Sequence, residues 1–434
     1  MTDHQNKQTI GARTLILHPH NKLKAPSLRS PEHRLEEAKS LVLAIELDVG
    51  GAFLVPLSRI TPATYIGSGK VKEMADYVRA NEITLTVMDC HLSPIQQRNL
   101  EQEMGCKVID RTALILEIFG ARARTKEGVL QVELAALEYQ KSRLVRSWTH
   151  LERQRGGFGF TGGPGETQIE VDRRMIRDRI AKIKGELEVV SRTRSLHRKN
   201  REAVPYPVVA LVGYTNAGKS TLFNRLTGEN VFVKNLLFAT LDPTMRFLAL
   251  PSGNKVILSD TVGFISDLPT QLVAAFRATL EEVVEADLLL HVRDIASLDS
   301  DAQRQDVLHV LTELGLEEKI KTSLYEVWNK IDLLDEGQKQ RGRGEQRIPV
   351  SAVTGEGIPE LLAEIDRFIS VGSRVITISV PAAEGKLVAW VFANGKNVVQ
   401  NRKADTLKLT CLMTEEDIAR FQKMSAGKAK ITPK

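Results

Sequence analysis

The sequence has 434 residues, of which 42% are hydrophobic and 26% charged, and a net charge of +6 at pH 7. This length exceeds one ordinary domain, and the composition excludes a disordered chain or a disulfide scaffold. No apolar run approaches the roughly twenty residues that a membrane-spanning helix needs. The residues after Met1 lack the apolar core of a signal peptide, and three scattered cysteines suit a reducing compartment. We therefore expect a soluble, cytoplasmic protein without an integral membrane segment, and leave peripheral membrane association open.

Residues 1–40 are polar and contain three prolines, which predicts a flexible N-terminal extension. Strands then alternate with helices over residues 41–111, which predicts a small N-terminal α/β domain with a parallel sheet. The expected strands are residues 41–47, 83–88 and 107–109, and the expected helices are residues 70–81 and 93–103.

Two long helical segments in residues 112–205 predict an antiparallel hairpin, with apolar residues at mixed helical spacings. The expected tip, residues 155–165, holds six glycines together with Phe158 and Phe160. Residues 141–205 carry 16 Lys and Arg against 8 Asp and Glu, so this segment has a charge of +8 and the rest of the chain about −2. A basic segment with a Gly-rich tip and two aromatic side chains favours contact with RNA.

Residues 206–370 predict a nucleotide-binding domain with a mostly parallel sheet and helices on both faces. Gly213-Tyr-Thr-Asn-Ala-Gly-Lys-Ser220 follows an apolar strand and opens a helix, as in a phosphate-binding P-loop. Its backbone N–H groups can surround phosphate oxygens, Lys219 can reach the β- and γ-phosphates, and the Ser220 hydroxyl can bind Mg²⁺. The chain is therefore expected to bind a nucleoside triphosphate.

Two later segments complete the expected phosphate end of the site. The segment from Phe238 to Thr244 offers a hydroxyl, for which we choose Thr240 over Thr244, that could join the Mg²⁺ shell and cover the γ-phosphate. Asp260-Thr-Val-Gly263 ends an apolar strand, so Asp260 can hold Mg²⁺ through water and the Gly263 N–H can contact the γ-phosphate.

Asn329-Lys-Ile-Asp332 selects the base. A carboxylate at Asp332 can accept from both N1–H and the N2 amine of guanine, a donor pair that adenine lacks. The Ser351-Ala352 backbone can meet the guanine O6. These residues predict GTP as the substrate, hydrolysed to GDP and phosphate. Because Phe264 stands where many GTPases place a water-orienting glutamine, we expect slow hydrolysis without a partner.

Residues 371–434 predict a small α+β C-terminal domain. Residues 375–380, 387–392 and 406–413 are the expected strands, and residues 414–424 the expected helix.

The Gly-rich segment from Arg155 to Arg174 resembles the signature of the HflX family of ribosome-associated GTPases. Residues 65–70, 108–112, 121–128, 148–153, 213–220, 238–244 and 260–265 are similar to the same family. The resemblance implies the multi-domain α/β architecture described above. It implies binding to the ribosome, mainly its large subunit and ribosomal RNA, with GTP-dependent splitting or rescue of stalled ribosomes under stress. It also implies Ser220 and Thr240 as the metal ligands for Mg²⁺.

The sequence departs from the family at two places. Residues 160–163 lack a basic residue that is usual in the Gly-rich loop, and Arg293 stands in a strand where an apolar residue is usual. The first departure removes a possible RNA contact, and the second is expected to perturb packing beside the site. Neither changes a nucleotide ligand.

The candidate site combines a small catalytic set with a larger nucleotide-binding set. The expected catalytic residues are Lys219, Thr240 and Gly263. The expected nucleotide-binding residues are Gly213, Tyr214, Thr215, Asn216, Ala217, Gly218, Lys219, Ser220, Thr221, Phe238, Ala239, Thr240, Leu241, Asp242, Asp260, Thr261, Val262, Gly263, Asn329, Lys330, Ile331, Asp332, Ser351, Ala352 and Val353.

Three other functions fit parts of the sequence. A large-subunit assembly GTPase would prefer immature particles, an ATP-dependent RNA-unwinding protein would use the N-terminal domain, and a signalling switch would act on proteins. Residues 65–70 are too short for a second P-loop, which argues against the unwinding protein, and the basic hairpin argues against the signalling switch. We expect a monomer that does not bind DNA.

Overall fold

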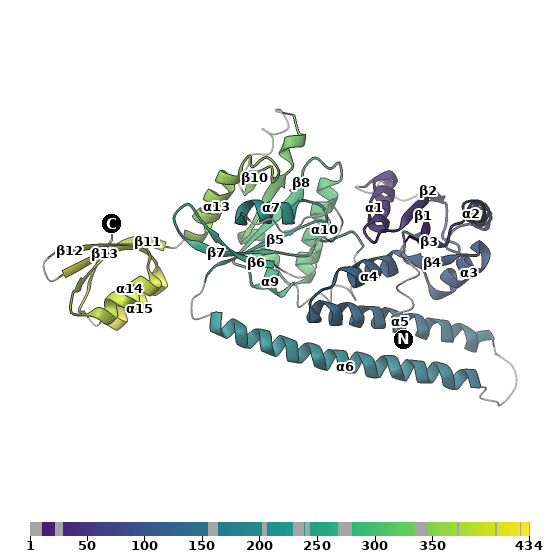
Figure 1. Ribbon diagram of the computed structural model, residues 1–434, viewed down its shortest axis with the longest axis horizontal. Coiled ribbons are helices and arrows are strands. Elements are labelled where there is room, and N and C mark those ends of the chain that lie inside the picture. The colour runs from purple at the N-terminus through teal and green to yellow at the C-terminus, as the bar shows by residue number, and fades with distance from the viewer. Residues whose placement is uncertain are drawn as a thin grey trace.

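The computed structural model describes residues 11–21, 29–154, 164–201, 206–228, 238, 244–267, 280–335, 346–370, 373–403, 406–425 and 427–433. Three sheets and a long helical hairpin follow one another along the chain (Figure 1). We call the four parts the N-terminal domain, the hairpin, the P-loop domain and the C-terminal domain. The multi-domain α/β architecture predicted from the sequence is confirmed.

The N-terminal domain is a four-stranded parallel sheet in the order β2-β1-β3-β4. One face packs on α2 and α3, and the other packs on α1 and α4. Its elements are β1 (Arg13–Asn21), α1 (Pro31–Leu43), β2 (Asp48–Leu57), α2 (Ser68–Ala80), β3 (Leu85–Met88), α3 (Pro94–Met104), β4 (Lys107–Asp110) and α4 (Arg111–Arg122).

The predicted flexible extension over residues 1–40 is wrong where the structure describes this segment. Residues 13–21 form β1, an inner strand, and α1 begins at Pro31. Ser30 caps α1 by accepting from the His33 N–H at 3.2 Å, and Pro31 occupies the first turn, where a missing N–H costs nothing. The three prolines of residues 1–40 suggest disorder, but Pro31 marks the start of a helix.

The predicted strand over residues 41–47 is also wrong. Its apolar residues Leu41 and Val42 belong to the buried face of α1. The strand that follows, β2, was missed because Gly50 and Gly51 lie within it. A Cβ on Gly51 would stand 2.6 Å from the Tyr77 hydroxyl, so glycine allows α2 to approach the sheet closely.

The hairpin consists of α5 (Lys126–Gln154) and α6 (Pro164–Arg201), which lie side by side and antiparallel, as predicted (Figure 1). Its predicted start at residue 112 is wrong, because residues 112–122 belong to α4, which packs on the N-terminal sheet. Leu130 and Leu134 of α5 pack on Ile180 and Ile183 of α6. Residues 155–163, which contain most of the predicted tip, lie outside the described residues.

The P-loop domain has a six-stranded sheet in the order β10-β9-β8-β5-β7-β6, parallel except for β6. Apolar clusters cover both faces, and one of them continues into the N-terminal domain. The elements are β5 (Val208–Gly213), α7 (Lys219–Thr227), β6 (Thr244–Ala249), β7 (Lys255–Asp260), α9 (Glu281–Glu285), β8 (Leu288–Asp294), α10 (Ser300–Glu313), α11 (Glu317–Thr322), β9 (Leu324–Asn329), the 3₁₀ turn η2 (Ile331–Leu333), β10 (Arg347–Pro349) and α13 (Ile358–Ser370).

The C-terminal domain is an antiparallel sheet in the order β12-β13-β11-β14 with two helices on one face (Figure 1). Its elements are β11 (Ser373–Pro381), α14 (Gly385–Asn394), β12 (Lys396–Lys403), β13 (Thr406–Thr414), α15 (Glu415–Ser425) and β14 (Lys430–Pro433). The predicted strand over residues 387–392 is wrong, because these residues lie in α14. Leu387 and Val391 are buried at a spacing of four, and a short apolar run does not by itself separate a helix from a strand.

Candidate functional site

The P-loop joins β5 to α7 in a conformation that two glycines permit. A Cβ on Gly213 would stand 2.3 Å from the Val292 carbonyl oxygen, so no side chain fits there. Gly218 has a φ of 93°, and a Cβ on it would stand 2.2 Å from Asn329 Nδ2. Both positions therefore require glycine for close approach, and Gly218 also for its left-handed backbone.

Lys219 is buried at the base of this loop. Its Nζ donates to the carbonyl oxygens of Gly213 at 3.1 Å and Tyr214 at 2.9 Å. Burial lowers the pKa of Lys219 to about 8, although Asp260 opposes that shift. The ammonium group is thus held inside the loop, where it can meet an anion.

Ser220 and Asp260 meet at the carboxyl ends of two neighbouring strands. The register of β5 with β7 places Asp260 beside Leu211, and the Ser220 hydroxyl donates to Asp260 Oδ2 at 2.6 Å. Asp260 is buried, so its carboxylate and the hydroxyl form a compact set of oxygen atoms. This donor set is of the kind that Mg²⁺ prefers when phosphate oxygens supply the remaining ligands. The described residues contain no group of three or more His, Cys, Asp or Glu that could hold a metal by itself.

The segment after Asp260 is paired with the P-loop backbone. The Thr215 N–H donates to the Phe264 carbonyl at 2.7 Å, and the Phe264 N–H donates to the Gly213 carbonyl at 3.1 Å. A Cβ on Gly263 would stand 2.9 Å from Thr215 Cα and 3.1 Å from Lys219 Nζ. Gly263 therefore lies against the phosphate-binding loop.

The Phe264 side chain is only 1% exposed and belongs to the apolar core shared with the N-terminal domain. It carries no hydrogen-bonding group and is packed in that core. In the described structure the Phe264 side chain therefore contributes to this apolar core.

The predicted base end is assembled around Asn329. Its Nδ2 donates to the Ala217 carbonyl at 2.9 Å, and its Oδ1 accepts from the Ala352 N–H at 3.0 Å. This one side chain joins the P-loop to the segment after β10. Asp332 is exposed on η2, and Lys330 Nζ pairs with Asp294 at 2.7 Å.

Of the predicted segment 238–244, the structure describes Phe238 and Thr244. Phe238 is buried and makes an edge contact with Phe119 of α4, with ring centroids 4.6 Å apart. Ala239, Thr240, Leu241 and Asp242 lie outside the described residues. Their predicted roles stay predictions.

Arg293 does not disturb packing beside the site. It pairs with Glu326 at 2.8 Å and Asp301 at 2.6 Å, and its guanidinium lies 5.6 Å from the centroid of the Trp328 ring. Burial alone would raise the pKa of Glu326, but hydrogen bonds from Arg304 and Trp328 and the charge of Arg293 lower it to about 2. The buried charge is therefore compensated, and the expected perturbation is not found.

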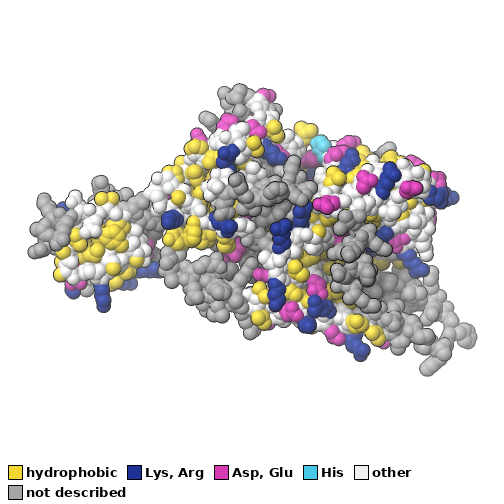
Figure 2. Space-filling view, viewed as in Figure 1, with side chains coloured by type: hydrophobic (Ala, Val, Ile, Leu, Met, Phe, Trp, Pro, Cys, Tyr) yellow, Lys and Arg dark blue, Asp and Glu magenta, His cyan; other side chains and the backbone are white. Residues whose placement is uncertain are grey.

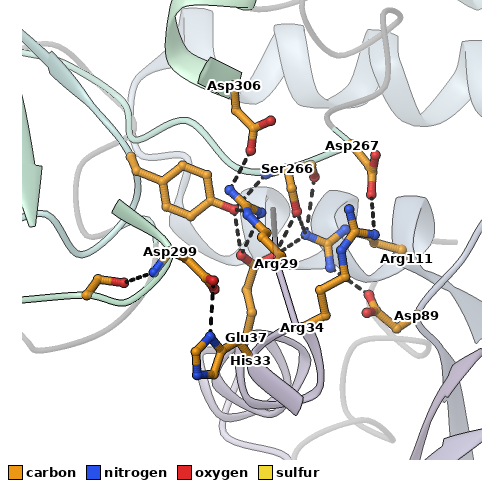
Figure 3. A network of polar contacts seen from close by, with 12 residues as sticks. Arg29, His33, Arg34, Glu37, Asp89, Arg111, Ser266, Asp267, Asp299 and Asp306 are labelled. Carbon is orange, nitrogen blue, oxygen red and sulfur yellow. Dashed lines mark hydrogen bonds and ion pairs between the residues drawn. The ribbon is translucent and has the colours of Figure 1, made fainter. Parts of the chain in front are cut away.

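A buried polar network joins the P-loop to the N-terminal domain (Figure 3). The Tyr214 hydroxyl accepts from Arg29 Nη1 at 3.0 Å and from the Ser266 N–H at 2.8 Å, and donates to Glu37 Oε2 at 2.5 Å. Tyr214 therefore faces the N-terminal domain, although it belongs to the predicted nucleotide-binding set.

Arg111 extends this network on the side of α4. It donates to the Ser266 hydroxyl at 2.9 Å and to the Ser266 carbonyl at 3.2 Å, and it pairs with Glu37. It also pairs with Asp89 at 2.6 Å. Burial alone would raise the pKa of Asp89, but Arg111 and His18 lower it to about 2. Arg111, Glu37 and Asp89 are thus each paired with a side chain of opposite charge.

Three outer contacts surround the network. Arg29 pairs with Asp306 at 2.5 Å, Arg34 with Asp267 at 3.2 Å, and His33 Nδ1 lies 3.0 Å from Asp299. Next to them, a cleft of about 270 Å³ opens between α1 and the P-loop domain. Tyr214, Thr215 and Asn216 are among the residues that line it.

Sequence reasoning missed the N-terminal residues of this network. Arg29 and Glu37 lie 185 and 177 residues from Tyr214 in the chain. No local motif signals such a contact. Both residues also fall in the segment that we predicted to be a flexible extension.

None of the described helices is both long enough and apolar enough to span a bilayer.

Four known sequence families match successive parts of the chain. Residues 32–120 match GTP-binding GTPase N-terminal, residues 122–201 GTP-binding GTPase Middle Region, residues 208–330 50S ribosome-binding GTPase, and residues 337–430 HflX C-terminal domain.

Individual relatives are similar over most of the chain. The GTPase HflX of Magnetococcus marinus is 52% identical over 86% of this chain and 85% of its own length. The GTPase HflX of Escherichia coli is 46% identical over 81% of this chain and 83% of its own. Among solved structures, a GTP-binding protein of Sulfolobus solfataricus in complex with GDP is 25% identical, covering 82% of this chain and 98% of its own, with a TM-score of 0.44.

Proposed function

The chain belongs to the HflX family of GTPases, and on this premise we propose that it binds the large ribosomal subunit and splits or rescues stalled ribosomes in a GTP-dependent manner. Ribosome association is consistent with the family matched by residues 208–330, which is described as ribosome-binding. The observation that supports a coupled function best is the Tyr214 network, because it joins the nucleotide site to the part of the chain that carries the hairpin.

The phosphate end of GTP is assigned to the P-loop. Lys219, which lies at the base of the loop, would contact the β- and γ-phosphates, and the Gly263 N–H would donate to the γ-phosphate. Ser220, with Thr240, would hold Mg²⁺, and Asp260 would orient it through water. When bound, Mg²⁺ neutralises charge on the β- and γ-phosphate oxygens. In hydrolysis a water oxygen attacks the γ-phosphorus, the bond to the β–γ bridging oxygen breaks, and GDP and phosphate leave.

The guanine end is assigned to Asp332, with the backbone segment around Ala352 lying near O6. The Ala352 N–H itself donates to Asn329. Asn329 holds this end at a fixed position relative to the P-loop, since it hydrogen-bonds to both. A fixed distance between the base site and the phosphate site lets one nucleotide occupy both sites at once.

The hairpin is assigned to RNA. Along the described part of α5 and α6, Lys and Arg side chains alternate with Asp and Glu (Figure 2), and ion pairs such as Arg179 with Glu133 join the two helices. Arg173 and Arg174 are the basic residues nearest the tip among the described side chains of α6. We therefore assign the RNA contact chiefly to the tip end of the hairpin.

The coupling follows from where Ser266 lies. It stands three residues after Gly263 and is held by Tyr214 and Arg111. A shift of Gly263 toward a γ-phosphate would pull on Ser266 and change its contacts with the N-terminal domain. Because coupling is reciprocal, ribosome binding through the hairpin would change the affinity of the site for GTP by the same factor.

Co-sedimentation tests this function. The protein is centrifuged with mature ribosomes, with isolated large and small subunits, and with immature large-subunit particles, each with a non-hydrolysable GTP analogue or with GDP. We expect analogue-dependent binding to the large subunit, appearance of free subunits from mature ribosomes, and ribosome-stimulated phosphate release. Preference for immature particles would instead favour an assembly GTPase. Absence of association in every nucleotide state would reject the ribosomal function.

A further inference from the structure

The C-terminal domain has the element order strand, helix, strand, strand, helix, strand, and the two central strands are β11 and β13. Both helices cover the same face of the sheet (Figure 1). Ile376, Ile378, Leu409 and Cys411 point toward these helices and form the core. Because side chains alternate along a strand, the residues between them lie on the opposite face, against which no described element packs in Figure 1.

The strand register arranges this open face into two rows. One row runs Asn401, Lys408, Ser379, Lys430 across β12, β13, β11 and β14. The adjacent row runs Val399, Thr410, Thr377, Thr432 across the same strands. The hydroxyls of Thr377 and Thr410 lie 3.1 Å apart, which confirms that the two side chains share this face.

The charge of the open face has one sign. Lys408 and Lys430 are exposed and flank Ser379, and none of the residues of β11, β12, β13 and β14 is Asp or Glu. In residues 373–403 and 406–433 the acidic side chains are Glu384, Glu415, Glu416 and Asp417, all within or next to the helices. The sheet face therefore offers lysines and hydroxyls without a competing carboxylate, a combination that fits an anion such as phosphate.

We propose that this open face of the C-terminal sheet is a binding surface for the sugar–phosphate backbone of RNA. Lys408 and Lys430, on the strands either side of β11, contact phosphates. The row of threonine hydroxyls contacts phosphate or sugar oxygens between them. Sheets of this element order bind RNA on the same face in known RNA-recognition domains, where aromatic side chains on the central strands stack on bases. The four strands here contain no Phe, Tyr, Trp or His, so the contact is to the backbone and tolerates any sequence.

This surface is separate from the hairpin, and the inference does not require the proposed ribosomal function. If that function is correct, the C-terminal domain adds a second RNA contact to the one assigned to the hairpin. If the protein does not bind ribosomes, binding of short RNA by this face is still tested by a separate measurement.

The test uses the full chain and a fluorescein-labelled oligouridylate about twelve nucleotides long. Affinity is measured by fluorescence anisotropy over a series of salt concentrations for Lys408→Gln/Lys430→Gln and for the control Lys386→Gln/Lys423→Gln. The control removes the same charge from exposed positions on α14 and α15. Both pairs are repeated with Arg173→Gln/Arg174→Gln, so that RNA binding by the hairpin does not conceal the effect.

We expect the sheet variant to bind about tenfold more weakly, and its slope of log K against log salt to fall by about 1.4, the value for two lost phosphate contacts on a single strand. The control should change neither quantity, and Lys408→Arg/Lys430→Arg should retain binding. Equal affinity and slope in the two Gln variants, with equal unfolding midpoints, would overturn the proposal. So would loss of ribosome binding with unchanged RNA binding, since that result would identify an acidic protein as the partner of this face.

Discussion

Asn329 is the residue on which the geometry of the nucleotide site depends most directly. It is 2% exposed and bonds to the Ala217 carbonyl and the Ala352 N–H, which belong to the two ends of the predicted site. The close approach of its amide also explains why position 218 is glycine. One side chain therefore sets both the shape of the P-loop and the distance to the base site.

Asn329→Ala should weaken the binding of GTP and GDP together by about 10- to 100-fold, because each lost buried hydrogen bond leaves a partner unsatisfied at about 1–3 kcal/mol. Titration with fluorescent guanine nucleotides would measure the change. Asn394→Ala, which removes an exposed amide from α14, should leave both affinities unchanged. A variant that loses affinity for GTP but not for GDP would show that Asn329 acts on the γ-phosphate. In that case it would not set the distance between the P-loop and the base site.

Asp332→Asn should change which base is bound. The carboxylate accepts two hydrogen bonds from guanine, whereas an amide has one acceptor and one donor and therefore pairs with N1–H and a carbonyl at C2, as in xanthine. We expect a preference for GTP over XTP to reverse, measured by competition between the two nucleotides. Unchanged selectivity would mean that the base site lies elsewhere.

At the scale of elements, α1 is the part of the structure that joins two domains. It contributes Glu37 to the Tyr214 network, and Arg29, two residues before the helix begins, contributes a second buried charge. Its apolar residues, including Leu41 and Val42, lie in the same core cluster as Phe264 and Val283 of the P-loop domain. Helix α1 thus packs both on the sheet of its own domain and on the P-loop domain.

Tyr214→Phe removes the hydroxyl at the centre of this network and keeps the buried ring. The Ser266 N–H loses its acceptor, so we expect a loss of about 1–3 kcal/mol in the free energy of unfolding. We also expect a smaller difference in ribosome affinity between the GTP-analogue and GDP states. Guanidinium unfolding and sedimentation in both states would measure these changes.

Tyr206→Phe is the matched control, because Tyr206 is partly exposed and its ring contacts Phe247 away from the network. It should alter neither stability nor nucleotide dependence. A Tyr214→Phe variant that is less stable but keeps the full nucleotide dependence would assign the network to stability alone. A double-mutant cycle with Glu37→Gln would then give the energy of the Tyr214–Glu37 contact.

At the scale of the whole molecule, the charge is distributed unequally. Residues 141–205 carry +8, and the remainder of the chain about −2. The hairpin extends beside the N-terminal and P-loop domains, and the C-terminal domain projects from the opposite end of the P-loop domain (Figure 1). Two surfaces with exposed basic residues are therefore held apart, with the nucleotide site between them.

Arg173→Gln/Arg174→Gln should weaken ribosome binding and reduce its dependence on salt, because each phosphate contact contributes to the release of counterions. Sedimentation at several salt concentrations would measure both effects, with Lys386→Gln/Lys423→Gln as a control of equal charge. The basal rate of GTP hydrolysis should stay unchanged, since α6 does not contribute to the nucleotide site. Equal behaviour of the two variants would mean that the tip end of the hairpin does not contact RNA.

Much of the nucleotide site could be predicted from the sequence because its parts are local. The P-loop encodes its own backbone path in eight residues, and Asp260, Gly263 and Asn329 each lie at or just after the carboxyl end of a parallel strand of one sheet. The carboxyl ends of such strands meet at one edge, so strand order alone brings these residues together. The long hairpin was likewise predictable, because its apolar spacing repeats over many turns.

Tertiary structure decided what depends on distant partners. Residues 13–21 form an inner strand because β2 and β3 satisfy the backbone on both sides, and residues 387–392 form a helix because one of its faces is buried against a sheet. The side chain of Tyr214 turns to Arg29 and Glu37, which lie more than 170 residues earlier in the chain. The sequence by itself therefore determined which nucleotide chemistry the chain carries, since that chemistry is written in short motifs. Only the folded chain determined what this chemistry is connected to, because a buried contact between remote residues leaves no local pattern.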